Sequence, residues 1–123
     1  MAQIFNQDVF IVGELGAQRI VGDTQLLRAG YLGSTIDLSS VESQVIKYNF
    51  LLFECIVQED YGVAYYETVI FDRRYQGEFL ESFRYGNNDC YVEKEVTEQI
   101  YYIGSSKENT SATCVAVYGI GGY

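Results

Sequence analysis

The chain contains no histidine, no proline and no tryptophan. Without histidine it has no imidazole that could act as a general base, bind zinc or change charge near neutral pH. Average usage would give about six prolines in a chain of this length. Basic residues are also scarce, with 8 Lys plus Arg against 17 Asp plus Glu and a net charge of -9. Because a phosphate backbone is bound by clustered Lys and Arg, we expect no nucleic-acid partner.

Long apolar runs are missing as well. None approaches the roughly 20 residues that a membrane span needs, and the first eight residues lack the basic and apolar segments of a signal peptide. We therefore predict a chain made in the cytoplasm without export and without a membrane partner. Its 123 residues, 48% hydrophobic, are enough for one domain with a core that needs no metal, disulfide or cofactor to fold.

The three cysteines are an odd number with wide spacing, and they form no CxxC pair of the kind found in zinc or thioredoxin-like sites. Cys55 and Cys114 lie within apolar runs, so we expect them to be small buried core residues. Cys90 follows a turn sequence, where it could be exposed. Free thiols of this kind suit a reducing compartment.

Residue types and periodicity predict strands along nearly the whole chain. Residues 45–57 carry apolar groups on both faces, so the second half of this strand should be covered on both sides. A short loop at residues 59–62 joins it to a return strand at 63–73, and this hairpin forms the centre of the fold. Further strands are predicted at 78–85, 90–96, 99–103 and 112–118, with a strong turn signal at 86–89.

The first 40 residues have a different sequence pattern from the rest of the chain, because here glycines at 13, 16, 22, 30 and 33 separate short predicted strands. Such strands cannot bury both faces alone, so residues 1–40 are expected to form an arm that packs on the body, residues 41–123, or on a neighbouring subunit. The predicted fold class is all-β: an antiparallel β-sandwich or partly closed barrel with a Gly-punctuated N-terminal β arm.

Carboxylates are the only catalytic groups present in quantity. Glu54 and Glu67 interrupt the apolar runs of the two central strands. If Gln58 faces Val63 across the loop, the antiparallel register places Glu54 opposite Glu67. Two opposed carboxylates beside many tyrosines would suit a carboxylate-based glycoside hydrolase. The alternative is structural: both side chains point to solvent or pair with basic residues such as Lys47, Arg73 and Arg84.

Asn87, Asp89 and Glu93 offer oxygen ligands that Ca²⁺ could use. Their spacing lacks the alternating acidic pattern of a dedicated calcium loop. The turn at 86–89 also accounts for Asn87 and Asp89 without a metal, since both residue types bond to their own backbone in turns.

The chain has 12 tyrosines, and a buried tyrosine needs a partner for its hydroxyl, so some of them must line a surface. Tyrosine-rich surfaces are typical of protein interfaces and also suit sugars. The candidate interface residues are Tyr61, Tyr65, Tyr66, Tyr75, Tyr85, Tyr101 and Tyr102.

Small size, β content, acidity and the missing catalytic groups favour a structural or interaction protein. A virion-type assembly component that forms a symmetric homo-oligomer, such as a phage head-decoration, head-fibre or tail protein, fits this description by compositional analogy. Three alternatives stay open: a β module that binds carbohydrate or a small ligand, the hydrolase built on Glu54 and Glu67, and an acidic mimic of nucleic acid.

Overall fold

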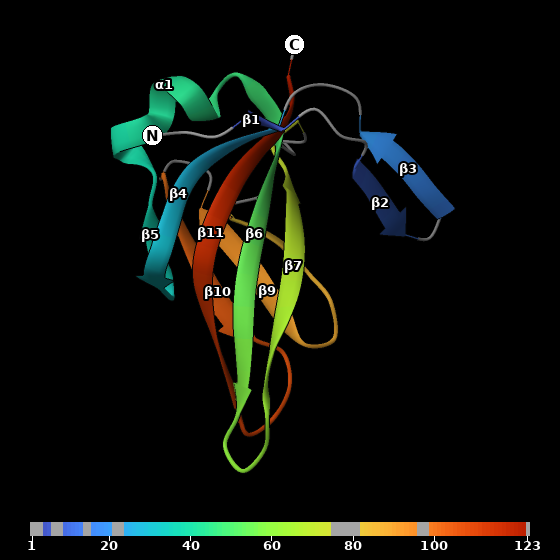
Figure 1. Cartoon of the computed structure of the whole chain (residues 1–123), viewed down its shortest axis with the longest axis vertical. Coiled ribbons are helices and arrows are strands. Elements are labelled where there is room, and N and C mark those ends of the chain that lie inside the picture. Colours follow the sequence, from blue (N-terminus) through green and yellow to red (C-terminus); the bar gives the residue numbers. More distant parts are fainter. Residues whose placement is uncertain are drawn as a thin grey trace.

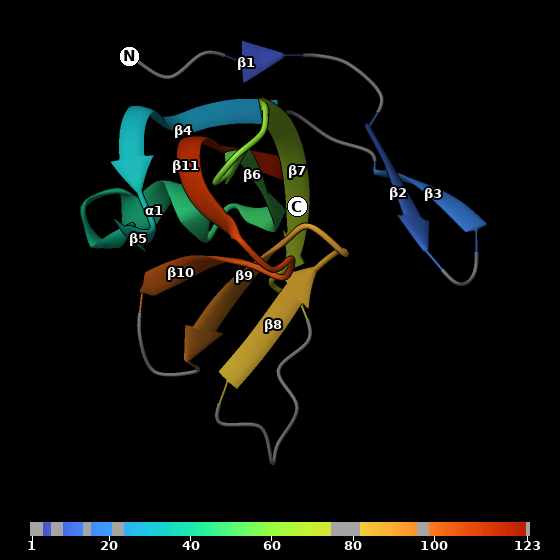
Figure 2. The same cartoon turned by 90° about the horizontal axis from the view of Figure 1, so that it is seen from below.

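The computed structural model describes residues 4–5, 9–13, 16–20, 24–74, 82–95 and 99–122. Strands from these ranges form two antiparallel sheets that pack face to face, as the view from below in Figure 2 shows. Among the described strands no ladder joins one sheet to the other, so the sheets do not close into a barrel. The all-β sandwich prediction is confirmed, and the partly closed barrel is not what forms.

The larger sheet has five strands in the order β1-β4-β11-β6-β7 (Figure 1). Its members are β1 (Ile4–Phe5), β4 (Thr24–Gly33), β11 (Thr110–Gly122), β6 (Tyr48–Glu59) and β7 (Ala64–Asp72). The smaller sheet has the order β5-β10-β9-β8. It is built from β5 (Thr35–Asp37), β10 (Ile100–Ser105), β9 (Cys90–Glu95) and β8 (Ser82–Gly86).

The N-terminal third of the chain divides between the sandwich and a separate hairpin. β2 (Val9–Gly13) pairs with β3 (Gly16–Ile20) in a two-stranded sheet of its own. In contrast, β4 pairs with β11, and β5 pairs with β10. Residues 24–37 thus supply one strand to each sheet of the sandwich. The division of the chain at residue 40 stays a prediction.

The central strand begins later than residue 45. A short 3-10 turn, η1 (Ser39–Val41), leads into one turn of helix, α1 (Glu42–Val45). Asp37 starts this turn by accepting the backbone N–H of Ser39 on its Oδ1 at 2.9 Å. The Ile46 N–H then donates to the Glu42 carbonyl at 3.1 Å. These local bonds outweigh the strand propensity of residues 45–47, so β6 starts at Tyr48.

The two faces of β6 differ in burial. The face toward the smaller sheet carries four apolar residues with no exposed surface: Leu51, Phe53, Cys55 and Val57. On the opposite face, Leu52 and Ile56 are only half-buried. The expected cover on both sides of the second half of this strand is therefore wrong. The smaller sheet packs on one face only, and an antiparallel sheet tolerates a partly solvated second face.

Most other strand predictions agree with the described residues. β9 and β10 match the predicted strands within two residues, while β11 runs beyond its predicted end as far as Gly122. β8 begins at Ser82, and the first part of the predicted 78–85 strand lies outside the described residues. An aromatic cluster fills the core between the sheets, where the Tyr101 ring lies 5.3 Å from the rings of both Phe53 and Phe71.

Candidate functional site

The two catalytic candidates, Glu54 and Glu67, do not face each other. Gln58 pairs with Ala64, which makes the loop one residue longer than predicted. Glu54 therefore lies opposite Thr68, and Glu67 lies opposite Cys55. Because a shift of one residue moves a side chain to the other face of a sheet, the carboxylates are on opposite faces. The opposed pair required by the hydrolase hypothesis is not formed.

Glu67 instead faces the inner side of the sheet and meets the β8–β9 turn. Asn87 donates from Nδ2 to Glu67 Oε2 at 3.4 Å. Partial burial raises the pKa of Glu67, and the carboxyl of Asp89, within hydrogen-bonding contact, raises it further. No sequence pattern predicted this Glu67–Asp89 pair, since the two residues are 22 positions apart and come from different sheets.

The three calcium candidates separate into two groups. Asn87 shapes the turn, because its Oδ1 accepts the backbone N–H groups of Asp89 at 2.8 Å and Cys90 at 3.0 Å. Glu93 lies further along β9, where its carboxylate forms an ion pair with the Arg84 guanidinium at 3.1 Å. In the part of the chain that the structure describes, no group of three or more acidic or cysteine side chains is placed to hold a metal ion.

Several of the predicted interface tyrosines belong to the interior. Tyr101 is 1% exposed, and its burial raises its pKa to about 12. Its prediction as a contact residue is wrong, because the alternation of β10 turns it toward Phe53 and Phe71. Tyr65 and Tyr85 are partly buried against the same core. Tyr75 lies outside the described residues.

Tyr91 has a local structural role as well. It lies opposite Gly104 on β10, and its ring occupies the space that a Cβ on this glycine would need. The Arg84 guanidinium lies over this ring, 4.0 Å from its centroid.

The exposed candidates gather at one end of the sandwich. We call this region the loop end and define it as residues 58–66, 86–90 and 104–110. Here Tyr61 is 102% exposed, Val63 is 71% exposed and Tyr66 is 67% exposed. All three belong to the β6–β7 hairpin, whose tip lies at the lower end of the sandwich in Figure 1. Tyr102, at 39%, lies on β10 of the other sheet.

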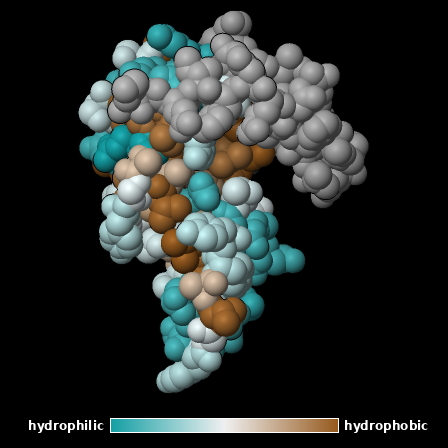
Figure 3. Space-filling view, in the orientation of Figure 1, coloured by the Kyte–Doolittle hydropathy of each residue, from teal (hydrophilic) through white to brown (hydrophobic). Residues whose placement is uncertain are grey.

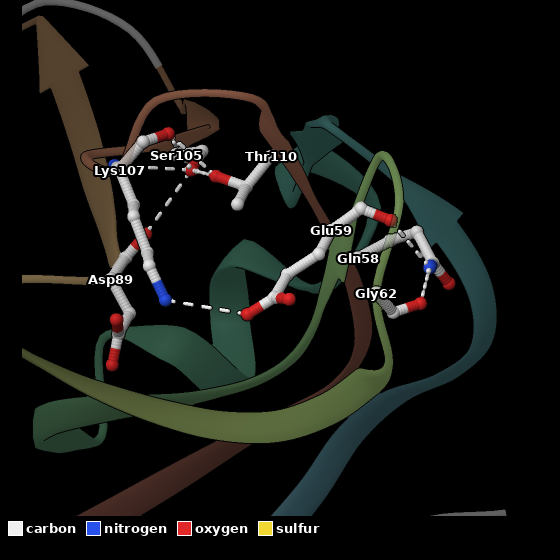
Figure 4. A network of polar contacts seen from close by, with 7 residues as sticks. All are labelled: Gln58, Glu59, Gly62, Asp89, Ser105, Lys107 and Thr110. Atoms are coloured by element: carbon white, nitrogen blue, oxygen red, sulfur yellow. Dashed lines mark hydrogen bonds and ion pairs between the residues drawn. The ribbon is translucent and has the colours of Figure 1, made fainter.

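A polar network joins the three segments of the loop end (Figure 4). Lys107 Nζ forms an ion pair with Glu59 Oε1 at 3.3 Å, which links the β10–β11 loop to the β6–β7 hairpin. The backbone N–H of Asp60 donates to the Asn109 carbonyl at 2.9 Å. Ser105 bonds to the Asp89 carbonyl and to Thr110. These contacts fix the position of the exposed hairpin tip.

The loop end is acidic as well as aromatic. Its carboxylates are Glu59, Asp60, Asp89 and Glu108, and Lys107 is its one cation. Above it, hydrophobic residues form a broken line down the outer face of the five-stranded sheet, flanked by polar residues (Figure 3). The half-buried Leu52, Ile56 and Ile70 lie on this face. Exposed aromatic and apolar groups rimmed by polar residues are typical of contact surfaces in proteins.

Comparison with protein-family models, curated proteins and solved structures gives no match for the chain. Within the described residues, no helix is both long enough and apolar enough to cross a bilayer.

Proposed function

We propose that the chain is a non-enzymatic structural protein that works by self-association in a symmetric assembly. The observation that carries this proposal is the loop end, where Tyr61, Val63 and Tyr66 are exposed on a hairpin that the network around Lys107 holds in place. Exposed aromatic residues on a rigid support lose little conformational entropy when they bind, which favours a contact role.

The geometry of the carboxylates supports a non-enzymatic role over the hydrolase. Glu54 and Glu67 point to opposite faces of one sheet, and Glu67 is bonded to the turn of the other sheet. A virion-type component, such as a head-decoration, head-fibre or tail protein, is the kind of assembly that we propose. This finer assignment rests on the small all-β domain, the acidic surface and the projecting hairpin.

Sedimentation velocity over a wide concentration range tests the proposal. We expect the full chain to form one discrete oligomer. A double variant, Tyr61→Ser with Val63→Ser, should weaken association, while Tyr31→Ser removes a tyrosine that is 82% exposed on β4 and should not. A wild-type chain that stays monomeric at millimolar concentration would refute the proposal, and clear hits on a glycan array would favour the carbohydrate-binding alternative instead.

A further inference from the structure

β7 is a long edge strand with few of the features that usually protect an edge, and its inward-facing charge is Glu67. It ends the five-stranded sheet, and among the described strands it pairs only with β6. Its sequence, AYYETVIFD, contains no glycine, proline or lysine, and its register with β6 is regular throughout. Exposed regular edges of this length are templates for pairing with another chain.

The other edges of the sandwich differ from β7. In the described part of the chain, β1 covers only Thr24 and Gln25 of β4. The rest of β4 is an edge, but it has register shifts against β11, and Gly30 and Gly33 take positive φ values of 105° and 78°. Such irregularities turn an edge strand away from potential partners. β5 is only three residues long, and β8 has five residues and carries Arg84.

The hydrogen-bond phase of the β6–β7 ladder shows which backbone groups of β7 point outward. Val63 accepts the N–H of Glu59 at 3.4 Å, and Arg73 donates its N–H to Asn49 at 2.8 Å. Bonded pairs alternate along an antiparallel ladder, so the odd-numbered residues of β7 bond to β6. The even-numbered residues direct their N–H and C=O groups away from the sheet: Ala64, Tyr66, Thr68, Ile70 and Asp72.

We propose that β7 pairs antiparallel with β7 of a second copy across a two-fold axis at Thr68, so that the two larger sheets become continuous. The inference rests on the proposed self-association and names its interface. Centring the pair on Thr68 uses all five outward residues of each strand, which allows about ten new backbone hydrogen bonds. Thr68 and Ala64 are exposed and Tyr66 is 67% exposed, so this part of the edge is accessible.

The side chains of β7 are complementary to themselves in this register. Tyr66 lies opposite Ile70 of the second copy, an aromatic and β-branched pair of the kind that stabilises sheets. Both residues lie on the outer face, where Tyr66 neighbours Ile56 and Ile70 neighbours Leu52 of β6. On the inner face, Glu67 lies opposite Val69 of the second copy, so the two Glu67 carboxylates are not directly opposed. A symmetric interface requires self-complementarity of this kind, which pairing with an unrelated peptide would not require.

The same register explains why the loop end is exposed in a single copy. The ladder continues past Ala64, so Val63 of one copy lies opposite Arg73 of the other. Val63 is 71% exposed in the single chain, and the second copy would cover part of this surface. The edge of β7 and the hairpin tip therefore belong to one interface.

Thr68→Pro tests the edge directly, because it removes an outward N–H while leaving the bonds from β7 to β6 in place. We expect this variant to sediment as a monomer where the wild type is a dimer, and the shape-matched control Thr68→Val to remain a dimer. An oligomer that survives Thr68→Pro overturns the β7 interface but leaves self-association standing. A monomeric wild type overturns both.

A cross-linking experiment does not depend on how well the proline variant folds. In a bonded antiparallel pair the two Cα atoms are about 5.5 Å apart, which suits a disulfide. Thr68→Cys should therefore oxidise to a covalent dimer about ten times faster than Thr35→Cys, an exposed threonine on edge strand β5. The native thiols are all buried and should not interfere. Equal rates for the two variants overturn the proposal.

Discussion

Cys55 of β6 and Cys114 of β11 lie directly opposite each other in the five-stranded sheet, and neither side chain has any exposed surface. Cys90, on β9 of the smaller sheet, is also fully buried. The thiol of Cys55 is in hydrogen-bonding contact with both other thiols, and these contacts together with burial raise its pKa far above the usual range. Three widely spaced cysteines thus converge in the core.

This burial predicts that none of the three thiols reacts in the native state, because a buried thiol does not meet the reagent. With Ellman's reagent we expect a signal close to zero for the native chain and a signal of three thiols per chain after unfolding in guanidinium chloride. A native chain that reacts at one thiol without unfolding would contradict the burial of Cys90. That result would support the exposed position expected from the sequence.

Gly119→Ala should destabilise the fold. The Tyr48 ring covers Gly119, and a Cβ at this position would overlap the ring. We expect a loss of about 1–3 kcal/mol in the free energy of unfolding, the typical effect of overpacking, measured by urea denaturation. Gly62→Ala is the matched control, because there the added Cβ meets mainly the flexible side chain of Glu59. Equal losses in the two variants would contradict the close packing of Tyr48 on Gly119.

The Glu67–Asp89 contact predicts a pH-dependent stability. The pKa of Glu67 is raised in the folded state, so the folded chain binds this proton more tightly than the unfolded chain. The stabilisation that protonated Glu67 contributes is fully present below its pKa in the unfolded chain, near 4.5. It is lost as the pH rises through the pKa of Glu67 in the folded chain. Above that value the charged carboxylate costs stability.

Glu67→Gln should therefore stabilise the chain at pH 7.5 and have a smaller effect near pH 4.5. The change should be less than about 1 kcal/mol, because the pair is partly solvated. Urea unfolding at both pH values measures it. Glu54→Gln, on the neighbouring strand β6, removes the same charge from the opposite face of the sheet and serves as the control. If both variants gain equally, the effect comes from net charge and not from Asp89.

The sequence was sufficient to predict the all-β sandwich because residue types that favour strands, separated by turn residues, recur along nearly the whole chain. It was not sufficient to predict the register. The β6–β7 loop is one residue longer than its turn residues indicated, and that single residue moved Glu54 and Glu67 to opposite faces.

The tyrosines and cysteines show a second feature that could not be predicted from the sequence, namely which side chains meet in the core. Tyr101 and Tyr102 are adjacent, so one must point inward, but nothing local indicates which sheet face the core will cover. The meeting of Cys55, Cys90 and Cys114 depends on the order of strands β6, β9 and β11 in two sheets. Long-range topology of this kind leaves no pattern in a single sequence.

Salt should strengthen self-association. Each copy carries a net charge of -9, and the loop end that borders the proposed interface is acidic. Two such copies repel each other, and this repulsion is screened when the Debye length falls from about 14 Å to about 4 Å between 50 and 500 mM salt. We expect the dissociation constant to fall several-fold over this range. Sedimentation equilibrium measures the change.

Asp60→Asn should imitate the effect of salt, since it removes a charge from the hairpin tip. We expect tighter association of this variant at 50 mM salt, and little difference from wild type at 500 mM. Glu95→Gln removes one charge from an exposed residue of β9 in the other sheet and should have a smaller effect. If association weakens as salt is added, ion pairs hold the two copies together. That outcome would contradict the proposed interface, in which Tyr66 pairs with Ile70.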